Sequence, residues 1–402
     1  MSPLRIRFSI RKFRDGAPEE MEICRKVGDL PHIRGHSLIH SRHSRRHLRL
    51  PSARFRPRAD RSLPPAACLL LLLLLTAHCS LLTTSAATGT WRRQQTSSLA
   101  WLHAVFFLDQ NRGWAVGSRG ALLSTINGGQ NWQAKSNPTQ DTIRDIYFAD
   151  ELNGWLVCER NIYDLRSNNE PRAYLMKTSD GGQNWERVNM HGAAVEARLM
   201  RAIFSVRGRG WAFGEGGAIF TTHDSGASWM RLRAPTPFLL LGGTFIDENI
   251  GWLVGAGATI LKTSDGGETW HHASLPNAAN VRFNSTSFVD GRLGWAVGSG
   301  GTIYRTINSG RTWKRQNSGV VSDLLDVKFL DAVEGWAVGN EGTVIHTIDG
   351  GLHWTIEQSS TPHALERVFF VDRTHGWAVG FGGTIISFGT SSGRGEAPKL
   401  RR

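Results

Sequence analysis

Oxygen-bearing side chains recur in this 402-residue chain beside glycine and tryptophan. Six segments follow the pattern Ser/Thr-x-Asp/Asn-x-Gly-x-x-Trp, and the first runs from Thr125 to Trp132. The Asp or Asn positions are Asn127, Asp180, Asp224, Asp265, Asn308 and Asp349. Carboxylate and amide oxygens are ligands for hard cations, so a repeated metal site is one interpretation.

A structural role explains these six segments better. They lie in separate repeats, and two of them carry Asn. An Asp or Asn side chain can accept hydrogen bonds from backbone N–H groups of its own turn, and the following Gly permits positive φ. The Trp residues would bury their rings with the indole N–H satisfied near the edge of the fold; they are Trp132, Trp185, Trp229, Trp270, Trp313 and Trp354. We therefore expect rigid turns and no metal or cofactor.

A second motif shows that the chain is built from repeats. A Gly-Trp pair recurs seven times with spacings of 41, 56, 41, 43, 41 and 41 residues, at Trp114, Trp155, Trp211, Trp252, Trp295, Trp336 and Trp377. Seven residues before each Trp lies a Phe. Self-similarity at this period is typical of propellers and other repeat folds.

Each repeat divides into four short apolar runs separated by turn residues. In the first repeat the runs are Ala104–Leu108, Gly113–Val116, Ala121–Thr125 and Asn131–Gln133. Four antiparallel strands in about 41 residues describe one propeller blade. The pattern predicts an all-β, seven-bladed propeller, with the Phe on the inner strand between blades and the second Trp on the outermost strand.

The last repeat lacks its second Trp, and the N-terminal region supplies a substitute. Trp91 lies 23 residues before Trp114, and Trp132, Trp229, Trp313 and Trp354 lie 23 residues before the next Gly-Trp. We therefore expect the strand around Trp91 to complete blade seven and close the ring, which would hide the free sheet edges.

These motifs carry a family resemblance over about residues 88–400. The turns resemble the Asp-box, or bacterial neuraminidase repeat, and with Gly-Trp-Ala-Val-Gly they resemble the photosystem II stability/assembly factor family. The resemblance implies a lumenal or periplasmic, non-enzymatic propeller that binds membrane-protein assembly intermediates. In photosynthetic members the partner is the newly made reaction-centre subunit.

Enzymatic alternatives fit the residues less well. A sialidase needs an arginine triad, a Tyr nucleophile and an Arg-Ile-Pro-like start; residues 88–402 contain four Tyr and no Arg-Ile-Pro. A xyloglucan-type glycosidase pairs two propellers around a cleft with two carboxylates, whereas the repeats of this chain predict a single propeller. The His residues show no metal-ligand spacing. A carbohydrate-active hydrolase or a lectin-like glycan-binding propeller remains the alternative to a binding scaffold.

One insertion and several arginines mark a candidate partner-binding face. Most of the extra length in the 56-residue spacing falls between Val157 and Tyr174, a turn that should open on the face of the blade connections. Candidate binding residues there are Arg160, Tyr163 and Arg166. Other arginines fall on blade connections or at inner-strand starts, where they could surround the channel mouth: Arg92, Arg93, Arg144, Arg198, Arg201, Arg282 and Arg367. The alternative is scattered solvated charge.

The N-terminal segment has a different character. Residues 1–87 hold 16 Lys+Arg against 6 Asp+Glu, a net charge of +10, whereas the remainder carries only +3. The net charge of the propeller therefore does not indicate nucleic-acid binding. The apolar run at residues 66–77 is short for a membrane span and suits a signal peptide.

We expect export to a periplasmic, lumenal or secreted location, with cleavage near Ala87. An uncleaved anchor or lipidation of Cys79 are the alternatives. The organisation is then an N-terminal extension and signal peptide (1–87), a propeller (88–395) and a basic tail (396–402), and we expect a monomer. Cys158 is the lone Cys after the cleavage site and is expected as a small apolar strand residue.

Overall fold

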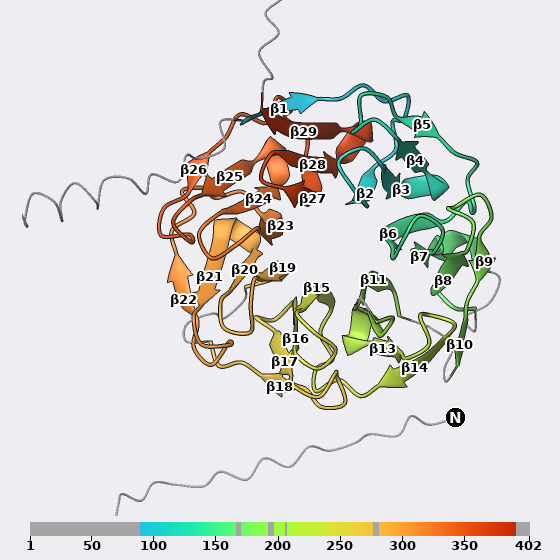
Figure 1. Ribbon diagram of the computed structural model, residues 1–402. Helices are drawn as coiled ribbons and strands as arrows, with labels where there is room; N and C mark the ends of the chain where they lie inside the picture. The colour runs from blue at the N-terminus through green and yellow to red at the C-terminus, as the bar shows by residue number, and fades with distance from the viewer. Residues whose placement is uncertain (1–88, 166–169, 192–196, 206, 276–280, 391–402) are drawn as a thin grey trace, which may run out of the picture. The chain divides into compact units, whose positions relative to one another are not determined.

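The computed structural model describes residues 89–390, except 166–169, 192–196, 206 and 276–280. The predicted signal peptide, Arg166 and the C-terminal tail lie outside the described residues. The described part forms seven antiparallel sheets arranged as blades around a central axis (Figure 1). None of the described elements is a helix long and apolar enough to cross a membrane.

Each blade is a meander in which successive strands pair from the axis outward. Blade 1 contains β2 (Leu102–Phe107), β3 (Gly113–Gly117), β4 (Leu122–Thr125) and β5 (Gln133–Ala134). Blade 2 contains β6 (Thr142–Phe148), β7 (Gly154–Glu159), β8 (Ala173–Thr178) and β9 (Glu186–Arg187). Blade 3 contains β11 (Leu199–Phe204), β12 (Gly210–Gly214), β13 (Ile219–Thr222) and β14 (Ser228–Leu232).

The remaining blades repeat this order. Blade 4 contains β15 (Leu240–Phe245), β16 (Gly251–Gly255), β17 (Ile260–Thr263) and β18 (His271–His272). Blade 5 contains β19 (Phe283–Phe288), β20 (Gly294–Gly298), β21 (Thr302–Thr306) and β22 (Lys314–Gln316). Blade 6 contains β23 (Leu324–Phe329), β24 (Gly335–Gly339), β25 (Val344–Thr347) and β26 (Thr355–Ile356).

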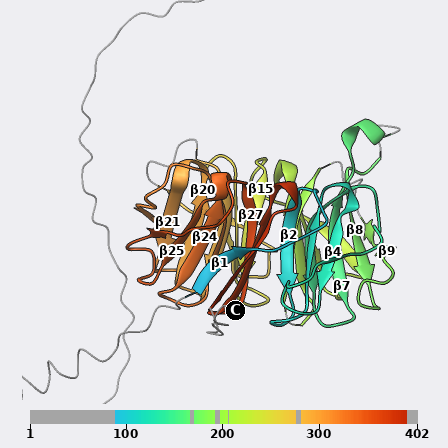
Figure 2. The ribbon, with the colours of Figure 1, turned by 90° about the horizontal axis from the view of Figure 1, so that it is seen from above.

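Blade 7 is completed by the N-terminal strand. It contains β27 (Leu365–Asp372), β28 (His375–Gly380), β29 (Ile385–Thr390) and β1 (Gly89–Arg93). β1 pairs antiparallel with β29, with Trp91 opposite Phe388 (Figures 1 and 2). Trp91 is 3% exposed and packs edge-on against Phe370 at 5.8 Å, as the outer Trp of other blades does against the blade Phe. The predicted closure and seven-bladed architecture are confirmed.

The recurring Phe and Gly-Trp residues interlock neighbouring blades. Phe329 stacks on Trp295 of the preceding blade with ring centroids 3.4 Å apart, and Phe107 of blade 1 stacks on Trp377 of blade 7 at 3.5 Å. The Gly before each Trp leaves room for the same blade's Phe, because a Cβ at Gly294 would lie 2.3 Å from the Phe288 ring. The Gly-Trp pair is therefore a packing device.

Blade 3 differs from the four-stranded prediction. A fifth strand, β10 (Asn189–His191), pairs parallel with the outer edge of β14. The connection from Trp185 to Trp211 is 26 residues rather than 23. These three extra residues allow the chain to run along the neighbouring edge before it enters blade 3.

Short 3-10 turns connect second and third strands in six blades. They are η1 (Ser118–Gly120), η2 (Ile162–Asp164), η3 (Glu215–Gly217), η4 (Ser299–Gly301), η5 (Asn340–Gly342) and η6 (Phe381–Gly383). The last residue of five of them is a Gly with positive φ that packs tightly on the blade connection. A Cβ at Gly301, for example, would lie 2.0 Å from the Val320 carbonyl oxygen.

Candidate partner-binding face and central channel

The strand register assigns the two faces of the ring. In every blade the start of the inner strand pairs with the end of the second strand, as Phe283 pairs with Gly298. The turns between second and third strands therefore open on the face that carries the blade connections. The Asp-box turns, which begin where third strands end, lie on the opposite face.

A β-bulge in every inner strand forms a ring of side chains near the connection face. The register shifts after the first residue of six inner strands and after the second residue of β6, so the bulged residue is the second of the strand or, in β6, the third. Bulges re-aim side chains. Here the bulged residues line one small cavity, of about 100 Å³, at this end of the channel; they are His103, Arg144, Met200, Leu241, Asn284, Leu325 and Glu366.

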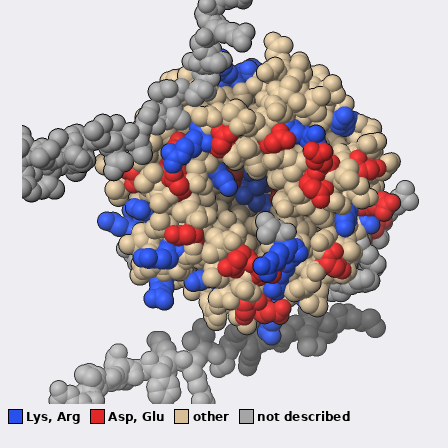
Figure 3. Space-filling view, in the orientation of Figure 1, with Lys and Arg blue, Asp and Glu red and all other residues tan. Residues whose placement is uncertain are grey.

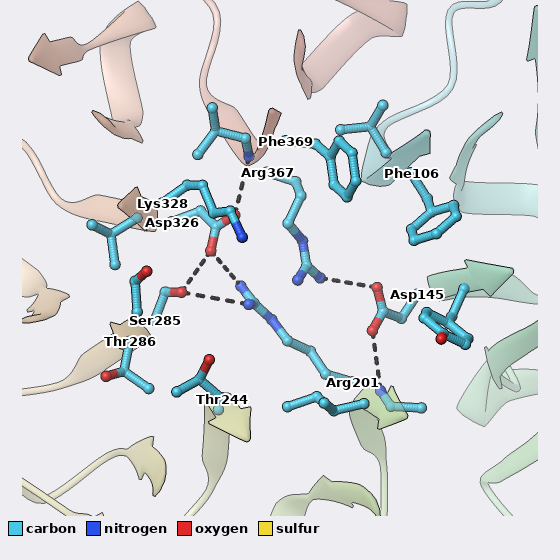
Figure 4. A pocket seen from close by; sticks show the side chains of 18 of the residues that line it. Phe106, Asp145, Arg201, Thr244, Ser285, Thr286, Asp326, Lys328, Arg367 and Phe369 are labelled. Atoms are coloured by element: carbon cyan, nitrogen blue, oxygen red, sulfur yellow. Dashed lines mark hydrogen bonds and ion pairs between the residues drawn. The ribbon is translucent and has the colours of Figure 1, made fainter. Parts of the chain in front are cut away.

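Two ion pairs cross the channel just below this ring. The Arg201 guanidinium of blade 3 lies 3.1 Å from the Asp326 carboxylate of blade 6. The Arg367 guanidinium of blade 7 lies 3.3 Å from the Asp145 carboxylate of blade 2. Figure 4 shows both arginines reaching into the centre from opposite walls. Ser285 also donates to Asp326, with 2.6 Å between the oxygens.

These pairs are buried and anchored to the backbone. Asp145 accepts a hydrogen bond from the Ala202 N–H at 3.0 Å, and Asp326 accepts one from the Val368 N–H at 3.0 Å. Burial by itself would raise the pKa of Asp326, but Arg201, Arg367 and the hydrogen bonds outweigh it and hold that pKa below its usual value. Because each carboxylate accepts a backbone N–H from the next blade, the pairs fix neighbouring blades as well as the channel.

Beyond the ion pairs the channel widens into a vestibule. The channel cavity has a volume of about 320 Å³ and is lined by inner-strand residues of all seven blades. Phe106 packs against Phe369 and Tyr147 at 5.3 and 5.4 Å on one wall, and hydroxyl side chains lie on the other. Lys328 extends into this space, where surrounding protein lowers its pKa while Asp326 opposes that shift. Figure 3 shows the opening, with a cationic side chain inside.

Five of the arginines predicted to surround the channel mouth do lie around it, and each of these five is paired with a carboxylate. Arg144 and Arg198 bind Glu159 and Glu215, respectively, and Arg282 lies 3.0 Å from Asp323. Arg201 and Arg367 are the buried residues that cross the channel. Arg92 and Arg93 lie on β1 at the outer rim. Whether any of these residues contacts a partner stays a prediction.

The blade 2 insertion projects from the connection face. Figure 2 shows this segment, between β7 and β8, standing above the ring. Arg160 pairs with Glu170 at 2.6 Å across the base of the insertion. Tyr163, on η2, is 88% exposed and is therefore available for contact. Cys158 at the end of β7 is fully buried, which raises the pKa of its thiol.

The Asp-box turns have the predicted hydrogen bonds. In the third box, Asp224 accepts from the Ser228 N–H at 2.9 Å, and Gly226, at φ 75°, donates its N–H to the Thr222 hydroxyl at 2.9 Å. Asn127 and Asn308 make the same contact as the four Asp residues. Within the described residues, no group of three or more His, Cys, Asp or Glu side chains could hold a metal ion.

The indole N–H groups of these boxes differ from expectation. Trp132 donates to Gln94 at 3.3 Å and Trp185 donates to the Gly182 carbonyl at 3.2 Å. Four others have no acceptor among the described residues: Trp229, Trp270, Trp313 and Trp354. The edge-on contact with the blade Phe sets the ring position, as between Phe329 and Trp354 at 5.8 Å and 90°. Ring packing thus outweighs hydrogen bonding of the N–H.

Sequence reasoning missed the partners of the channel arginines. Arg201 and Asp326 are 125 residues apart, and no motif joins them. One signal was present: Asp145, Arg201, Ser285, Asp326 and Arg367 occupy the same position in their repeats, three residues before the blade Phe. Residues at one repeat position lie at one height in the channel, so ion pairs between opposite charges at this position could have been predicted from the sequence.

Comparison with known proteins assigns the family. The model of the photosynthesis system II assembly factor YCF48 matches residues 133–238, 233–320 and 317–389. A solved structure of YCF48 bound to a D1 peptide aligns with a TM-score of 0.62 and 20% identity, over 75% of this chain and 97% of that chain. YCF48 from Cyanidioschyzon merolae aligns with a TM-score of 0.62 and 18% identity, over 75% of this chain and 99% of that chain.

Enzymes with propeller folds are similar too. The xyloglucanase from Xanthomonas campestris aligns with a TM-score of 0.58 and 13% identity, over 74% of this chain and 53% of that chain. At such identities the structural likeness concerns the fold alone. A search among curated proteins gives no match. Because the family model covers well over half of the sequence, this chain belongs to the family of the photosynthesis system II assembly factor YCF48.

Proposed function

We propose that this protein is a non-catalytic, exported scaffold that binds a segment of a membrane protein during its assembly. The observation that carries this proposal is the family match over residues 133–389, together with a similar solved YCF48 that holds a D1 peptide. A rigid ring whose connection face carries an insertion and several arginines is suited to binding a partner, since the ring loses little conformational freedom when the partner binds.

The channel chemistry supports a binding role over a hydrolytic one. Glycoside hydrolysis needs one carboxylic acid that gives up a proton and one free carboxylate. Asp145 and Asp326 are each tied to an arginine and to a backbone N–H. The lowered pKa of Asp326 keeps its carboxylate ionised at neutral pH, so Asp326 is a poor candidate for a general acid.

The connection face is the proposed site of partner contact. Arg198 and Arg282 keep 31% and 48% of their side chains exposed although both are paired with carboxylates. Exposed ion pairs contribute little to stability, typically below about 1 kcal/mol, so these arginines can exchange partners at low cost. Tyr163 adds an exposed aromatic side chain on the same face.

Binding can be measured with the full chain and a detergent extract of membranes from the same cells. Captured subunits are identified by mass spectrometry after cross-linking. A variant carrying Tyr163→Ala, Arg198→Glu and Arg282→Glu should lose at least about tenfold of the captured partner. Arg201 and Arg367 are unsuitable for this test, because their replacement would disturb the buried channel.

The matched control places charge reversals at Arg112 and Arg207, which lie in turns between first and second strands, on the face opposite the blade connections. Equal capture by the connection-face variant and the wild-type protein would refute this site. A glycan screen separates the alternative function: turnover that disappears on replacing a single carboxylate would refute the non-catalytic scaffold.

Export is a separate part of the proposal with its own measurement. The predicted cleavage near Ala87 leaves about one residue, Thr88, before the first residue of β1, so cleavage would keep the closing strand intact. N-terminal sequencing of the protein isolated from its cells should begin near residue 88. A mature protein that retains residues 1–65 would refute this part.

A further inference from the structure

Blade 5 carries a concentration of positive charge that the whole-chain balance conceals. Residues Phe283–Gln316 contain five Lys or Arg and a single Asp, whereas the chain after residue 87 has a net charge of only +3. The five cationic residues are Arg292, Arg305, Arg311, Lys314 and Arg315. Figure 3 shows blue side chains gathered with few red ones over the region of β21 and β22.

Among the described residues, these cations lack the carboxylate partners that the arginines around the channel have. The five arginines around the channel are each paired with a carboxylate, but no ion pair among the described residues involves Arg305, Arg311, Lys314 or Arg315. On the neighbouring blade, partial burial and then the positive charge of Arg311 lower the pKa of Lys262. The local field is therefore positive and uncompensated.

A groove with apolar walls runs through this cationic surface. It has a volume of about 620 Å³, and Arg305, Lys314, Arg315 and neighbouring residues of blades 5 and 6 line it. Two aliphatic side chains at its border face solvent, with Ile307 58% and Leu352 63% exposed. Such a mixture of apolar surface and one sign of charge fits a segment that is both acidic and apolar.

The backbone beside the groove has an unused hydrogen-bonding edge. β22 is the outermost strand of its sheet and pairs only with β21 among the described strands. It has three residues, whereas β5, β9, β18 and β26 have two. Blade 3 demonstrates that an outer edge in this ring accepts another strand, because β10 pairs there with β14.

From these features we propose that the outer edge of β22 binds an extended, acidic segment of a partner protein as a fifth strand of blade 5. Backbone hydrogen bonds to β22 would give affinity, and alternate side chains would reach the groove. Carboxylates of the segment would pair with Arg311, Lys314 and Arg315. These charges also repel neutral or basic strands, which gives the edge its selectivity.

The partner is a different molecule from this chain's own termini. The two terminal segments outside the described residues are basic, with a net charge of +10 over residues 1–87 and +3 over residues 391–402. Neither is complementary to blade 5. The proposal concerns a surface apart from the connection face and does not depend on what that face binds.

The probe is a fluorescein-labelled ten-residue peptide of alternating glutamate and valine, and fluorescence anisotropy measures its binding to the full chain. Changing Arg311, Lys314 and Arg315 to Glu should weaken binding at least about tenfold, and raising NaCl from about 0.1 to 0.5 M should weaken it as well. Hydrogen exchange should slow at the amides of residues 314–317 when the peptide is bound.

Two controls separate strand addition from charge attraction. Arg231→Glu with Arg233→Glu reverses two exposed charges on blade 3, whose edge is already occupied, and should change affinity less than about twofold. A peptide of alternating glutamate and proline keeps the carboxylates but cannot pair as a strand, and should bind at least about tenfold more weakly.

Three outcomes would overturn the proposal. One is unchanged binding by the triple variant, with its unfolding midpoint unchanged. Another is equal binding of the proline peptide. The third is binding to phosphatidylglycerol-containing vesicles without binding to the glutamate–valine peptide, which would assign the surface to a membrane. None of these outcomes bears on partner capture through Tyr163, Arg198 and Arg282.

Discussion

Closure of the ring through Trp91 yields a quantitative prediction. The indole ring lies 5.6 Å from Trp336, 5.8 Å from Phe370 and 5.5 Å from Phe388, between ring centroids. Trp91→Ala removes these contacts and leaves a cavity, which costs about 3–5 kcal/mol for a buried Trp. With an unfolding entropy of about 2.1 cal/mol/K per residue over roughly 300 residues, the melting temperature should fall by about 5–8 °C.

The matched control is Trp270→Ala. Trp270 makes the equivalent edge-on contact with Phe245 at 6.0 Å, but its strand is joined covalently to the rest of blade 4. Both variants should lose similar global stability. Only Trp91→Ala should let one strand detach, because no loop joins β1 to β29 and the two strands are held together by pairing and packing.

Hydrogen exchange read out by mass spectrometry distinguishes the two variants. A local loss of about 3 kcal/mol corresponds to roughly a hundredfold faster exchange at residues 89–93 and 386–390 in Trp91→Ala. The same segments should be unchanged in Trp270→Ala. If both variants exchange alike at residues 89–93, or if Trp91→Ala melts like the wild-type protein, the closing role of this strand is refuted.

Three further predictions follow from the turns and the core. Burial by itself would raise the pKa of Asp224 and Asp265, but hydrogen bonds, chiefly from Ser228 and Thr269, together outweigh it and lower both to about 2. The stabilisation that these two carboxylates give is therefore complete above about pH 4 and is lost as pH falls through 2. In the double variant Asp224→Asn, Asp265→Asn, the melting temperature should decline less steeply with pH over that window. An unchanged decline would contradict this prediction. Gly294→Ala should lower the free energy of unfolding, measured in urea, by about 2–3 kcal/mol, because its Cβ would lie 2.3 Å from the Phe288 ring. Gly300→Ala has open space around its Cβ but a φ of 62°, and should cost about 1 kcal/mol. The reverse order would be inconsistent with the packing role of Gly294. Burial raises the pKa of the Cys158 thiol, so peptide mapping after iodoacetamide treatment should find Cys158 unmodified at pH 8 until the protein is unfolded, and rapid labelling of the folded protein would disprove its burial.

The repeat made the architecture readable from the sequence. Spacing alone placed Trp91 on blade 7, and the strand runs of the first repeat agree with the structure to within about two residues at each end. This success has a physical cause: each blade's Phe packs against the preceding blade's Trp, so the motif that repeats in sequence is the contact that joins the blades.

What differs between blades was harder to predict. The β10 strand depends on three additional residues whose direction no motif specifies. Arg201 and Arg367 were expected among surface arginines, whereas the structure shows their guanidinium groups paired across the channel axis. The cationic surface of blade 5 was obscured because the charge count was taken over the whole propeller. Counting by blade would have shown the five Lys or Arg against Asp290.

The arrangement of blade 7 has a consequence for the life of the chain. The first strand of the propeller to be synthesised, β1, finds its place only when β29, the last strand, is present. A prematurely terminated chain would leave blade 7 incomplete and its aromatic residues uncovered, and proteases would recognise it readily. The ring thus reports its own completeness, and assembly of its last blade must await release of nearly the entire polypeptide.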